Sequence, residues 1–349
     1  MLKTIAVTDF RCFTSLRIDG LERFNLVLGA NNVGKTALLE ALFLHLGGFN
    51  AALPRLLEEM RGASTQSVEP EELWGWLFRG RDLNREIRIE SSDDSGRGHE
   101  LIVRVSTAGA MTSSAPVYSE PAFATSGVAR GLRLECKFTD GVSIRSRADV
   151  ADPGLSIENG PRDRFPTVIF LPAVQRASRD NSSMFSRLEQ EGRTEWLTSA
   201  LRRLDPRLKR LAILVFGGAP VIHADLGEPP LVPISHLGQG FGRAMSVLLA
   251  ISLARDGVVL IDEIENGLYH EAMDQVWNAI REAALHANAQ VFATTHSWEC
   301  IRSAHAAFPP STEANLRLVR LERIDGAIES VSYDAESLAM ALKTEIEVR

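Results

Sequence analysis

The first segment that could do chemistry reads Gly29-Ala30-Asn31-Asn32-Val33-Gly34-Lys35-Thr36, which fits the pattern G-x-x-x-x-G-K-[ST] at every fixed position. Glycines at both ends let the backbone turn tightly, so that consecutive N–H groups point inward at phosphate oxygens. In this pattern Lys35 would reach the β- and γ-phosphates of a nucleotide, and the Thr36 hydroxyl would bind Mg²⁺. The segment therefore predicts a nucleotide-binding loop.

The elements that must position this loop stand on either side of it. Residues 25–28 form an apolar run of strand length, and after the loop apolar residues recur at helical spacing. A helix that starts near Gly34 would add the positive end of its dipole to the phosphate cradle. Strand, loop and helix come in the required order, which makes a chance glycine turn with a surface lysine the weaker alternative.

A second pair of reactive side chains, Asp262 and Glu263, follows the apolar run Val258–Ile261. A buried parallel strand delivers the residues after it to the sheet edge where open α/β sheets bind ligands. There Asp262 would hold Mg²⁺, most simply through water, and Glu263 would polarise the attacking water as general base. Alone this motif is weak and fits a strand entering an acidic loop; the glycine loop makes it specific.

A histidine follows the next strand in the same way. The strand 290–294 leads into Thr294-Thr295-His296-Ser297. Because parallel strands end at one edge, His296 would emerge beside Asp262 and contact the γ-phosphate or the attacking water. A structural or surface histidine is the alternative, which the position after a carboxylate-bearing strand disfavours.

Composition limits the class of protein. The chain has 349 residues, 45% hydrophobic and 24% charged, which suits a globular protein of one large or two ordinary domains. A net charge of −7 argues against a nucleic-acid binder over its whole surface but permits a local basic patch. Three scattered cysteines predict free thiols in a reducing compartment. With no signal segment and no long apolar run, we expect a cytoplasmic protein without membrane contact.

The rest of the chain alternates β-rich and helical sections. Residues 2–18 predict a hairpin, and period-two runs between 87 and 144 predict a small antiparallel sheet joined by exposed loops at 91–98 and 107–128. A buried strand is expected within 167–175 and helices within 176–210, and aromatic residues at 73–78 predict a packing plug. The last third predicts the following elements: helices 240–254 and 269–287, strands 257–261 and 290–294, and a hairpin around Asp325-Gly326.

The helical section 176–210 is unusually basic. It contains nine basic and five acidic residues, a net charge of +4 inside a chain of −7. A solvated helix face and a surface for phosphate backbone or an acidic partner explain this pattern equally well.

Taken together, these motifs resemble ABC-type ATPase heads, and within them the RecF-like and OLD (overcoming lysogenisation defect) ATPases. The resemblance spans almost the whole chain, in order. The residues that carry it are Phe10-Arg11-Cys12-Phe13, the glycine loop 29–36, LGQGFGR at Leu237–Arg243, LIDEIENGL at Leu260–Leu268, and TTHS at Thr294–Ser297.

The resemblance implies an ATP-driven clamp, in which each ATP lies between the glycine loop of one chain and the signature of a second. The signature residues are Gly238, Gln239 and Gly240. It also implies that Lys35, Glu263 as catalytic glutamate and His296 as switch histidine act in hydrolysis, and that residues 265–268 cross the dimer interface. Gln175 would sense Mg²⁺ beside Thr36 and Asp262, and Arg11 would contact the nucleotide.

Two departures from the family pattern matter. The family signature has a serine where this chain has Gly238, so the hydroxyl contact with the γ-phosphate across the dimer is in doubt, although the helix end at Gly240 offers N–H groups. After Ser297 only 52 residues remain, too few for the nuclease domain that OLD proteins often carry. We therefore expect the ATPase part alone.

We predict a single α/β domain, residues 1–349, with the fold of a P-loop NTPase of the ABC-ATPase head type. It would have a mixed core sheet with flanking helices, an antiparallel β-subdomain and a helical lid. Residues 1–175 would form an N-terminal lobe with the glycine loop and β-insert. Residues 176–234 would form a helical, arginine-rich subdomain, and 235–349 a C-terminal lobe with the signature, Asp262, Glu263 and His296.

The leading hypothesis for function is a Mg²⁺-dependent ATPase whose ATP-bound homodimer controls a separate effector, a nuclease or other protein acting on nucleic acid in phage defence or DNA repair. One alternative is a repair ATPase that binds DNA directly through residues 176–210. Another is the ATPase subunit of a membrane transporter. The altered signature, the β-insert and the basic helical section disfavour the transporter.

Overall fold

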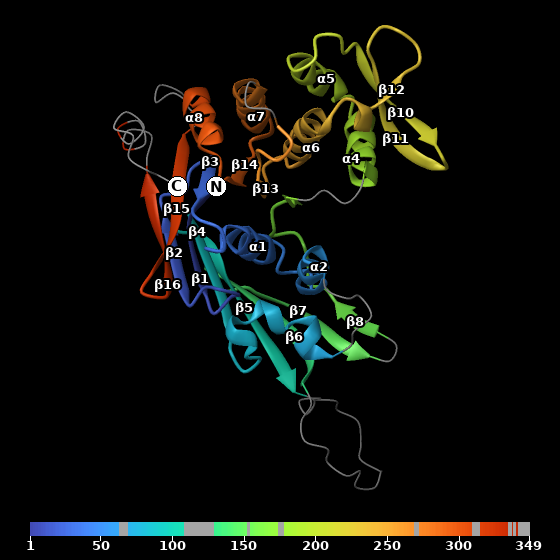
Figure 1. Cartoon of the computed structure of the whole chain (residues 1–349). Helices are drawn as coiled ribbons and strands as arrows, with labels where there is room; N and C mark the ends of the chain where they lie inside the picture. Colours follow the sequence, from blue (N-terminus) through green and yellow to red (C-terminus); the bar gives the residue numbers. More distant parts are fainter. Residues whose placement is uncertain are drawn as a thin grey trace.

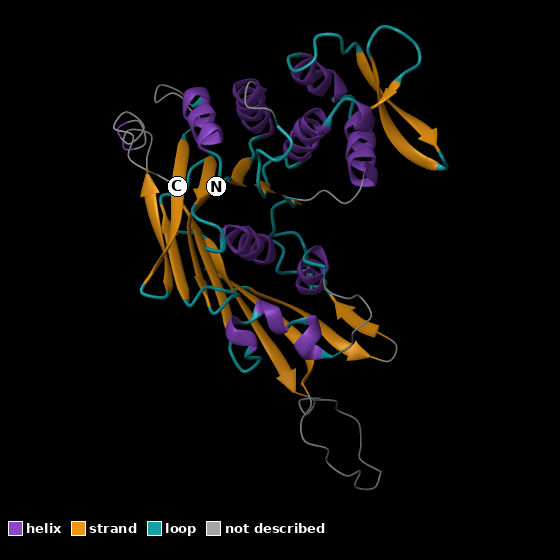
Figure 2. Cartoon of the chain, viewed as in Figure 1, coloured by secondary structure: helices purple, strands orange, loops and turns teal. Residues whose placement is uncertain are grey.

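The computed structural model describes residues 1–62, 69–107, 129–151, 154–173, 178–268, 272–308 and 315–333, together with 337 and 340. Within this part of the chain three β-sheets carry the fold (Figures 1 and 2). A core sheet lies against most of the long helices. An antiparallel sheet forms a second lobe below it in Figure 1, and a short sheet stands at the far end of the helical region.

The core sheet delivers the predicted site residues. In the described residues it has six strands, in the order β16-β15-β3-β14-β13-β9, and all but β16 run parallel. Its strands, in that order, are β16 (Ala327–Tyr333), β15 (Leu316–Ile324), β3 (Phe24–Leu28), β14 (Gln290–Thr294), β13 (Val258–Ile261) and β9 (Val168–Leu171). The predicted strands and the hairpin around Asp325-Gly326 are confirmed.

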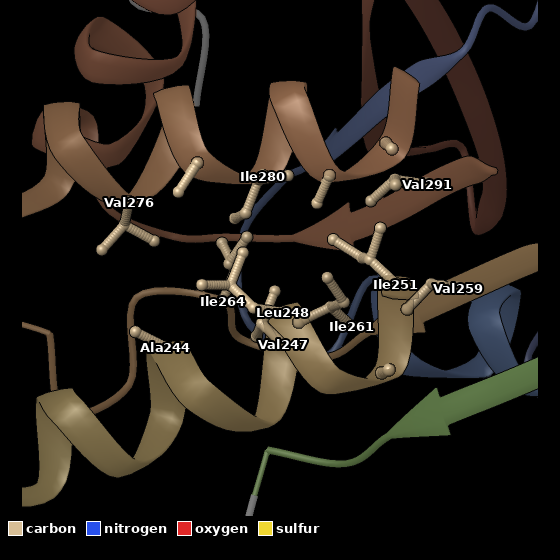
Figure 3. Packing of buried hydrophobic residues seen from close by; sticks show 14 of the residues in the cluster. Ala244, Val247, Leu248, Ile251, Val259, Ile261, Ile264, Val276, Ile280 and Val291 are labelled. Carbon is tan, nitrogen blue, oxygen red and sulfur yellow. The ribbon is translucent and has the colours of Figure 1, made fainter. Parts of the chain in front are cut away.

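Alternate residues of the core strands face opposite layers, as the pleat of a strand requires. On one face, residues such as Leu26, Val259 and Val291 belong to the cluster that contains α6 (Gln239–Leu253), α7 (Met273–Ala287) and α8 (Trp298–Ala307). Figure 3 shows this layer, with Leu248 of α6 and Ile280 of α7 meeting the sheet. The other face, with Val27, Leu260 and Phe292, belongs to the cluster around α1 (Lys35–Leu46).

The antiparallel lobe is larger than predicted. Its seven strands in the described residues run in the order β2-β1-β4-β5-β6-β7-β8. They are β2 (Ser15–Asp19), β1 (Leu2–Thr8), β4 (Ile87–Asp93), β5 (Gly98–Thr107), β6 (Ala129–Phe138), β7 (Ser143–Ala151) and β8 (Gly154–Glu158). The predicted N-terminal hairpin and the predicted small sheet are both present, but β1 pairs with β4 and makes them one sheet. Helix α1 contacts both this sheet and the core sheet, and α2 (Leu53–Met60) packs on α1.

The region 176–234 is only partly helical, which differs from the predicted helical subdomain. It begins with two helices, α4 (Ser178–Gln190) and α5 (Thr194–Arg202), as expected. It then forms a three-stranded sheet of β10 (Arg210–Phe216), β11 (Ala219–Asp225) and β12 (Val232–Pro233). The reason lies in the run 211–216, rich in large and β-branched residues, and in the Gly217-Gly218 pair, whose φ angles of 58° and 79° suit a hairpin turn.

Several smaller predictions agree with the structure only in part. The plug at 73–78 buries Leu73, Trp74 and Phe78, but Trp76 is 57% exposed under the Arg81 guanidinium. The exposed loop expected at 91–98 shrinks to a turn, because β4 extends to Asp93 and Ser91 is buried. The loop expected at 107–128 lies outside the described residues beyond Thr107, and α7 begins at Met273, with 269–271 outside them. Cys12, Cys136 and Cys300 are free thiols, and no described helix is long and apolar enough to cross a membrane.

Candidate active site

The predicted nucleotide loop joins β3 to α1, as its sequence requires. The Lys35 ammonium donates to the carbonyl oxygens of Gly29 (2.7 Å) and Ala30 (3.0 Å), so it lies folded over the loop. Helix α1 begins at Lys35, and no side chain caps its first turn, which leaves N–H groups for phosphate oxygens. Burial lowers the pKa of Lys35 below its usual value, and the nearby carboxylates after β13 oppose the shift.

Asp262 stands at the centre of a hydroxyl–carboxylate cluster. The Thr36 hydroxyl donates to its Oδ2 at 2.9 Å, and the Thr294 hydroxyl donates to its Oδ1 at 2.6 Å. The three side chains come from α1, the end of β13 and the end of β14, which the parallel sheet brings to one edge. The structure thus brings the predicted Thr36 and Asp262 together, and adds Thr294 to them.

This cluster fits a bound Mg²⁺. The Asp262 side chain is buried, and it and Thr36 supply the hard oxygen donors that Mg²⁺ prefers. Asp262 has hydroxyl partners but no cationic side chain bonded to it among the described residues, so its charge is left for a metal ion. Gln175, the third predicted metal-site residue, lies outside the described residues.

Glu263 follows Asp262 in a strained backbone conformation, with φ of 46°. Its N–H donates to the Thr294 hydroxyl at 2.8 Å, and its carboxylate accepts from the Asn266 amide at 2.6 Å. A non-glycine residue persists at positive φ only when its surroundings fix it, and such residues gather at active sites. The geometry is that of a carboxylate held in place beside the proposed metal site.

His296 emerges after β14 at the same edge, as predicted. The backbone N–H of His296 donates to Glu265 Oε1 at 2.8 Å, and the ring atom Nδ1 of His296 lies 3.1 Å from the same oxygen. The ring is 53% exposed, whereas the Glu265 side chain is only 9% exposed. The imidazole is therefore partly exposed to solvent, and it contacts a largely buried carboxylate.

Arg243 is a site residue for which the sequence offered no role beyond its place in the signature segment. It lies on α6, is buried, and its guanidinium donates to the carbonyls of Pro172 (3.0 Å) and Asp262 (2.5 Å) and, at 3.3 Å, to that of Glu263. Burial lowers the pKa of Arg243, an effect opposed by the carboxylates that follow β13. Arg243 therefore joins α6 to the end of β13, which carries the predicted catalytic carboxylates.

The signature residues Gly238, Gln239 and Gly240 form the start of α6. Gly238 has φ of 93° and ψ of 155°, a region that only glycine adopts readily, so a serine in this backbone conformation would be strained. The first turn of α6 has no side-chain cap and borders a cavity of about 800 Å³. The residues that line this cavity include Phe216, Asn266 and Gly267, but none from the glycine loop.

Arg11 does not fit the predicted contact with nucleotide. Its side chain is 8% exposed, and its guanidinium pairs with Glu40 at 2.6 Å and Glu58 at 3.1 Å. Arg61 joins the cluster through two bonds to Glu40. Glu40 lies on α1 and Glu58 on α2, so Arg11 joins these two helices to the N-terminal hairpin.

The basic section 176–210 is largely neutralised by its own neighbours. Arg193, Arg203, Arg207 and Arg210 pair with acidic side chains, and Arg202 donates to the Leu208 and Lys209 carbonyls. Arg176 and the Arg179 side chain lie outside the described part. The described arginines therefore favour the solvated-surface interpretation over a phosphate-binding one.

Three comparisons with known proteins bear on this site. A family profile described as "AAA domain, putative AbiEii toxin, Type IV TA system" matches residues 142–301. A Helicobacter pylori protein named "ATP/GTP phosphatase" is 22% identical over 333 residues, covering 86% of this chain and 86% of that protein. An SMC head bound to the C-winged helix domain of ScpA has a TM-score of 0.51 and 13% identity, covering 98% of this chain and 99% of that one. An SMC head with an extended coiled coil, from a complex derived from Pyrococcus furiosus, has a TM-score of 0.49, 13% identity and 99% coverage of both chains.

These findings confirm the predicted fold. The chain has the fold of a P-loop ATPase head of the ABC type, the class to which SMC heads belong. The family match and the curated relative support ATP hydrolysis by this chain. The narrower resemblance to RecF-like and OLD ATPases stays a prediction.

Proposed function

We propose that this chain is a Mg²⁺-dependent ATPase that closes into an ATP-sandwiched homodimer and thereby controls a separate effector protein. The observation that carries the catalytic part is the convergence of Thr36, Asp262 and Thr294 beside Glu263. These side chains come from three separate segments and meet at the head of the glycine loop.

The residues divide the work of hydrolysis among them. The glycine-loop amides and Lys35 would hold the β- and γ-phosphates, and Thr36 and Asp262 would hold Mg²⁺, which offsets charge that develops on the phosphates. Glu263 would orient the attacking water and accept its proton. His296 would contact the γ-phosphate from the neighbouring strand end, and Arg243 would keep Glu263 in place through the backbone.

The dimer is supported by the separation of the two phosphate-binding elements. The uncapped N-terminus of α6 at Gly238–Gly240 borders a cavity that no glycine-loop residue lines. A helix N-terminus binds phosphate well, so this surface suits the nucleotide of a second copy. Cleavage of the γ-phosphate would then remove the bond between the copies and open them.

The effector would be a protein that acts on nucleic acid. The resemblance to RecF-like and OLD ATPases favours a nuclease-like partner in phage defence or DNA repair, and the matched family is described in terms of a toxin of a toxin–antitoxin system. Direct binding of DNA is less well supported, because Arg203, Arg207 and Arg210 of the basic section form ion pairs with neighbouring acidic side chains.

The test uses the Glu263→Gln variant. It should bind ATP, lose turnover by about a hundredfold or more because the general base is gone, and accumulate as a dimer with ATP and Mg²⁺ in size-exclusion chromatography with light scattering. Lys35→Ala is the matched control and should stay monomeric. A Glu263→Gln chain that hydrolyses ATP normally would contradict the catalytic assignment, and one that stays monomeric with bound ATP would contradict the dimer.

A further inference from the structure

The Glu265 carboxylate contacts the predicted switch histidine in two ways. Its Oε1 accepts the His296 N–H at 2.8 Å and lies 3.1 Å from the ring atom Nδ1. Glu265 lies in the segment after β13, whereas His296 follows β14, so the contact joins two strand ends of the core sheet. The Glu265 side chain therefore connects the ends of β13 and β14 at the sheet edge that carries the predicted nucleotide site.

The burial of Glu265 separates it from an ordinary surface pair. Its side chain is 9% exposed, and in the described part of the structure its Oε2 is buried without a hydrogen-bond partner. A buried carboxylate with one oxygen unsatisfied is costly for the folded state. Because this carboxylate contacts the half-exposed His296, we infer that its unfavourable burial is tolerated because it positions the imidazole.

The contact fixes the form of the imidazole. An ionised carboxylate can only accept hydrogen bonds, so its Oε1, 3.1 Å from Nδ1, favours the tautomer in which Nδ1 carries the proton. The other nitrogen, Nε2, is then the atom left to meet a ligand, as an acceptor in the neutral ring and a donor in the charged one. Because the backbone N–H is held by the same oxygen, the ring is fixed in orientation as well as tautomer.

We propose that Glu265 is the positioning residue for His296: it fixes the Nδ1–H tautomer and aims Nε2 at the γ-phosphate site. This inference deepens the proposed ATPase function and rests on it for the role of Nε2. The contact itself and the tautomer do not depend on it.

Two measurements on purified full-length chain test the proposal. Steady-state ATPase assays compare wild type, Glu265→Ala, Glu265→Gln, His296→Gln and the Glu265→Ala/His296→Gln double variant. The ¹⁵N shifts of the histidine ring nitrogens, assigned through the peak that His296→Gln removes, report the tautomer without reference to activity. Glu299→Gln is the matched control, because Glu299 is exposed and lies three residues from His296.

We expect Glu265→Ala to lower kcat about tenfold or more, with little change in KM, because the imidazole loses its orientation. Its His296 ring should move toward the Nε2–H tautomer. Glu265→Gln keeps an accepting oxygen and should fall between wild type and Glu265→Ala. The double variant should be no slower than His296→Gln, and Glu299→Gln should match wild type.

The opposite results are equally clear. An unchanged His296 tautomer in Glu265→Ala, or kcat losses that multiply in the double variant, would overturn the proposal. If wild type hydrolyses no ATP, the proposed function fails, while the ring shifts still decide whether Glu265 sets the tautomer. Thermal melting of Glu265→Gln and wild type shows whether a loss of kcat is a loss of folded protein.

Discussion

The two predicted phosphate-binding surfaces of this chain differ in how many of their contacts are already formed in the single chain. At the glycine loop, side chains from separate segments already bond to one another: Lys35 to the loop carbonyls, and Thr36 and Thr294 to Asp262. At the signature, Gly238 and Gln239 are exposed, no side chain caps α6, and the contacts on offer are backbone N–H groups beside an open cavity. We call the glycine-loop surface the assembled half, because its side chains already bond to one another. We call the signature surface, residues 238–240, the open half, because it offers only backbone N–H groups.

This difference indicates how the chain could couple ATP hydrolysis to the formation of a dimer. The assembled half would bind nucleotide in the monomer, and the open half would gain its ligand only when a second copy brings it. Arg243 links the halves, because it lies on the signature helix and donates to the backbone of Asp262 and Glu263.

Removing the Lys35 ammonium should disable the assembled half. We expect Lys35→Ala to lower ATP turnover by about a hundredfold or more, because in the proposed mechanism its charge would stabilise the transferring phosphate. ATP binding, measured by isothermal titration calorimetry, should weaken in the same variant. Turnover close to that of wild type would remove the glycine loop from the mechanism.

Truncating the link between the halves should cost stability as well as activity. Arg243→Ala leaves the buried carbonyl of Asp262 and the partly buried carbonyl of Pro172 without this donor, so the free energy of unfolding should fall by about 1–3 kcal/mol. Urea denaturation measures this change. The exposed Arg255 is the matched control, and Arg255→Ala should change stability by less than about 0.5 kcal/mol. Equal effects of the two substitutions would mean that Arg243 does not anchor the strand end.

Changing the open half should separate binding from turnover. A side chain at Gly238 strains a backbone that only glycine adopts readily, at a cost of about 1–3 kcal/mol, so the start of α6 should shift. We expect Gly238→Ala to lower turnover about tenfold, the equivalent of 1.4 kcal/mol. ATP affinity of the monomer should be unchanged, and a parallel loss of monomer affinity would argue that the two surfaces act on one nucleotide within one chain.

The smallest expected effect concerns the partner of Glu263. Asn266→Ala removes the 2.6 Å hydrogen bond that holds the Glu263 carboxylate, which leaves the general base present but less well placed. Turnover should fall only about two- to fivefold, because a lost hydrogen bond is worth about 0.5–1.5 kcal/mol. A loss as large as that of Glu263→Gln would instead assign Asn266 a direct role.

The sequence predicted the assembled half better than the open one, for a physical reason. The glycine loop and the Asp262-Glu263 pair are set by local order of strand, turn and helix, which a linear pattern shows. The roles of Arg243, Thr294 and Glu265 depend on which strand ends become neighbours, and only the folded sheet decides that. The buried ion pairs of Arg11 were not predicted, because its carboxylate partners, Glu40 and Glu58, lie far along the chain.

The fold shows the same division. The core strands and the helix α6 were predicted because each has a clear period and flanking turn signals. The hairpin of β10 and β11 was missed because the arginine-rich helices before it set the expectation for the whole section, although its Gly-Gly turn was visible. The pairing of β1 with β4 joins residues at least 80 positions apart, for example Thr8 with Arg88, and no local pattern encodes that contact.

Mixing two impaired chains tests the central claim most directly. The Glu263→Gln chain keeps an intact signature, and the Gly238→Ala chain keeps an intact glycine loop and general base. If each ATP lies between two chains, the mixed dimer has one fully intact site, and an equal mixture should regain about a quarter of wild-type turnover. Activity that stays at the average of the two separate variants, at protein concentrations where the chains associate, would contradict the account.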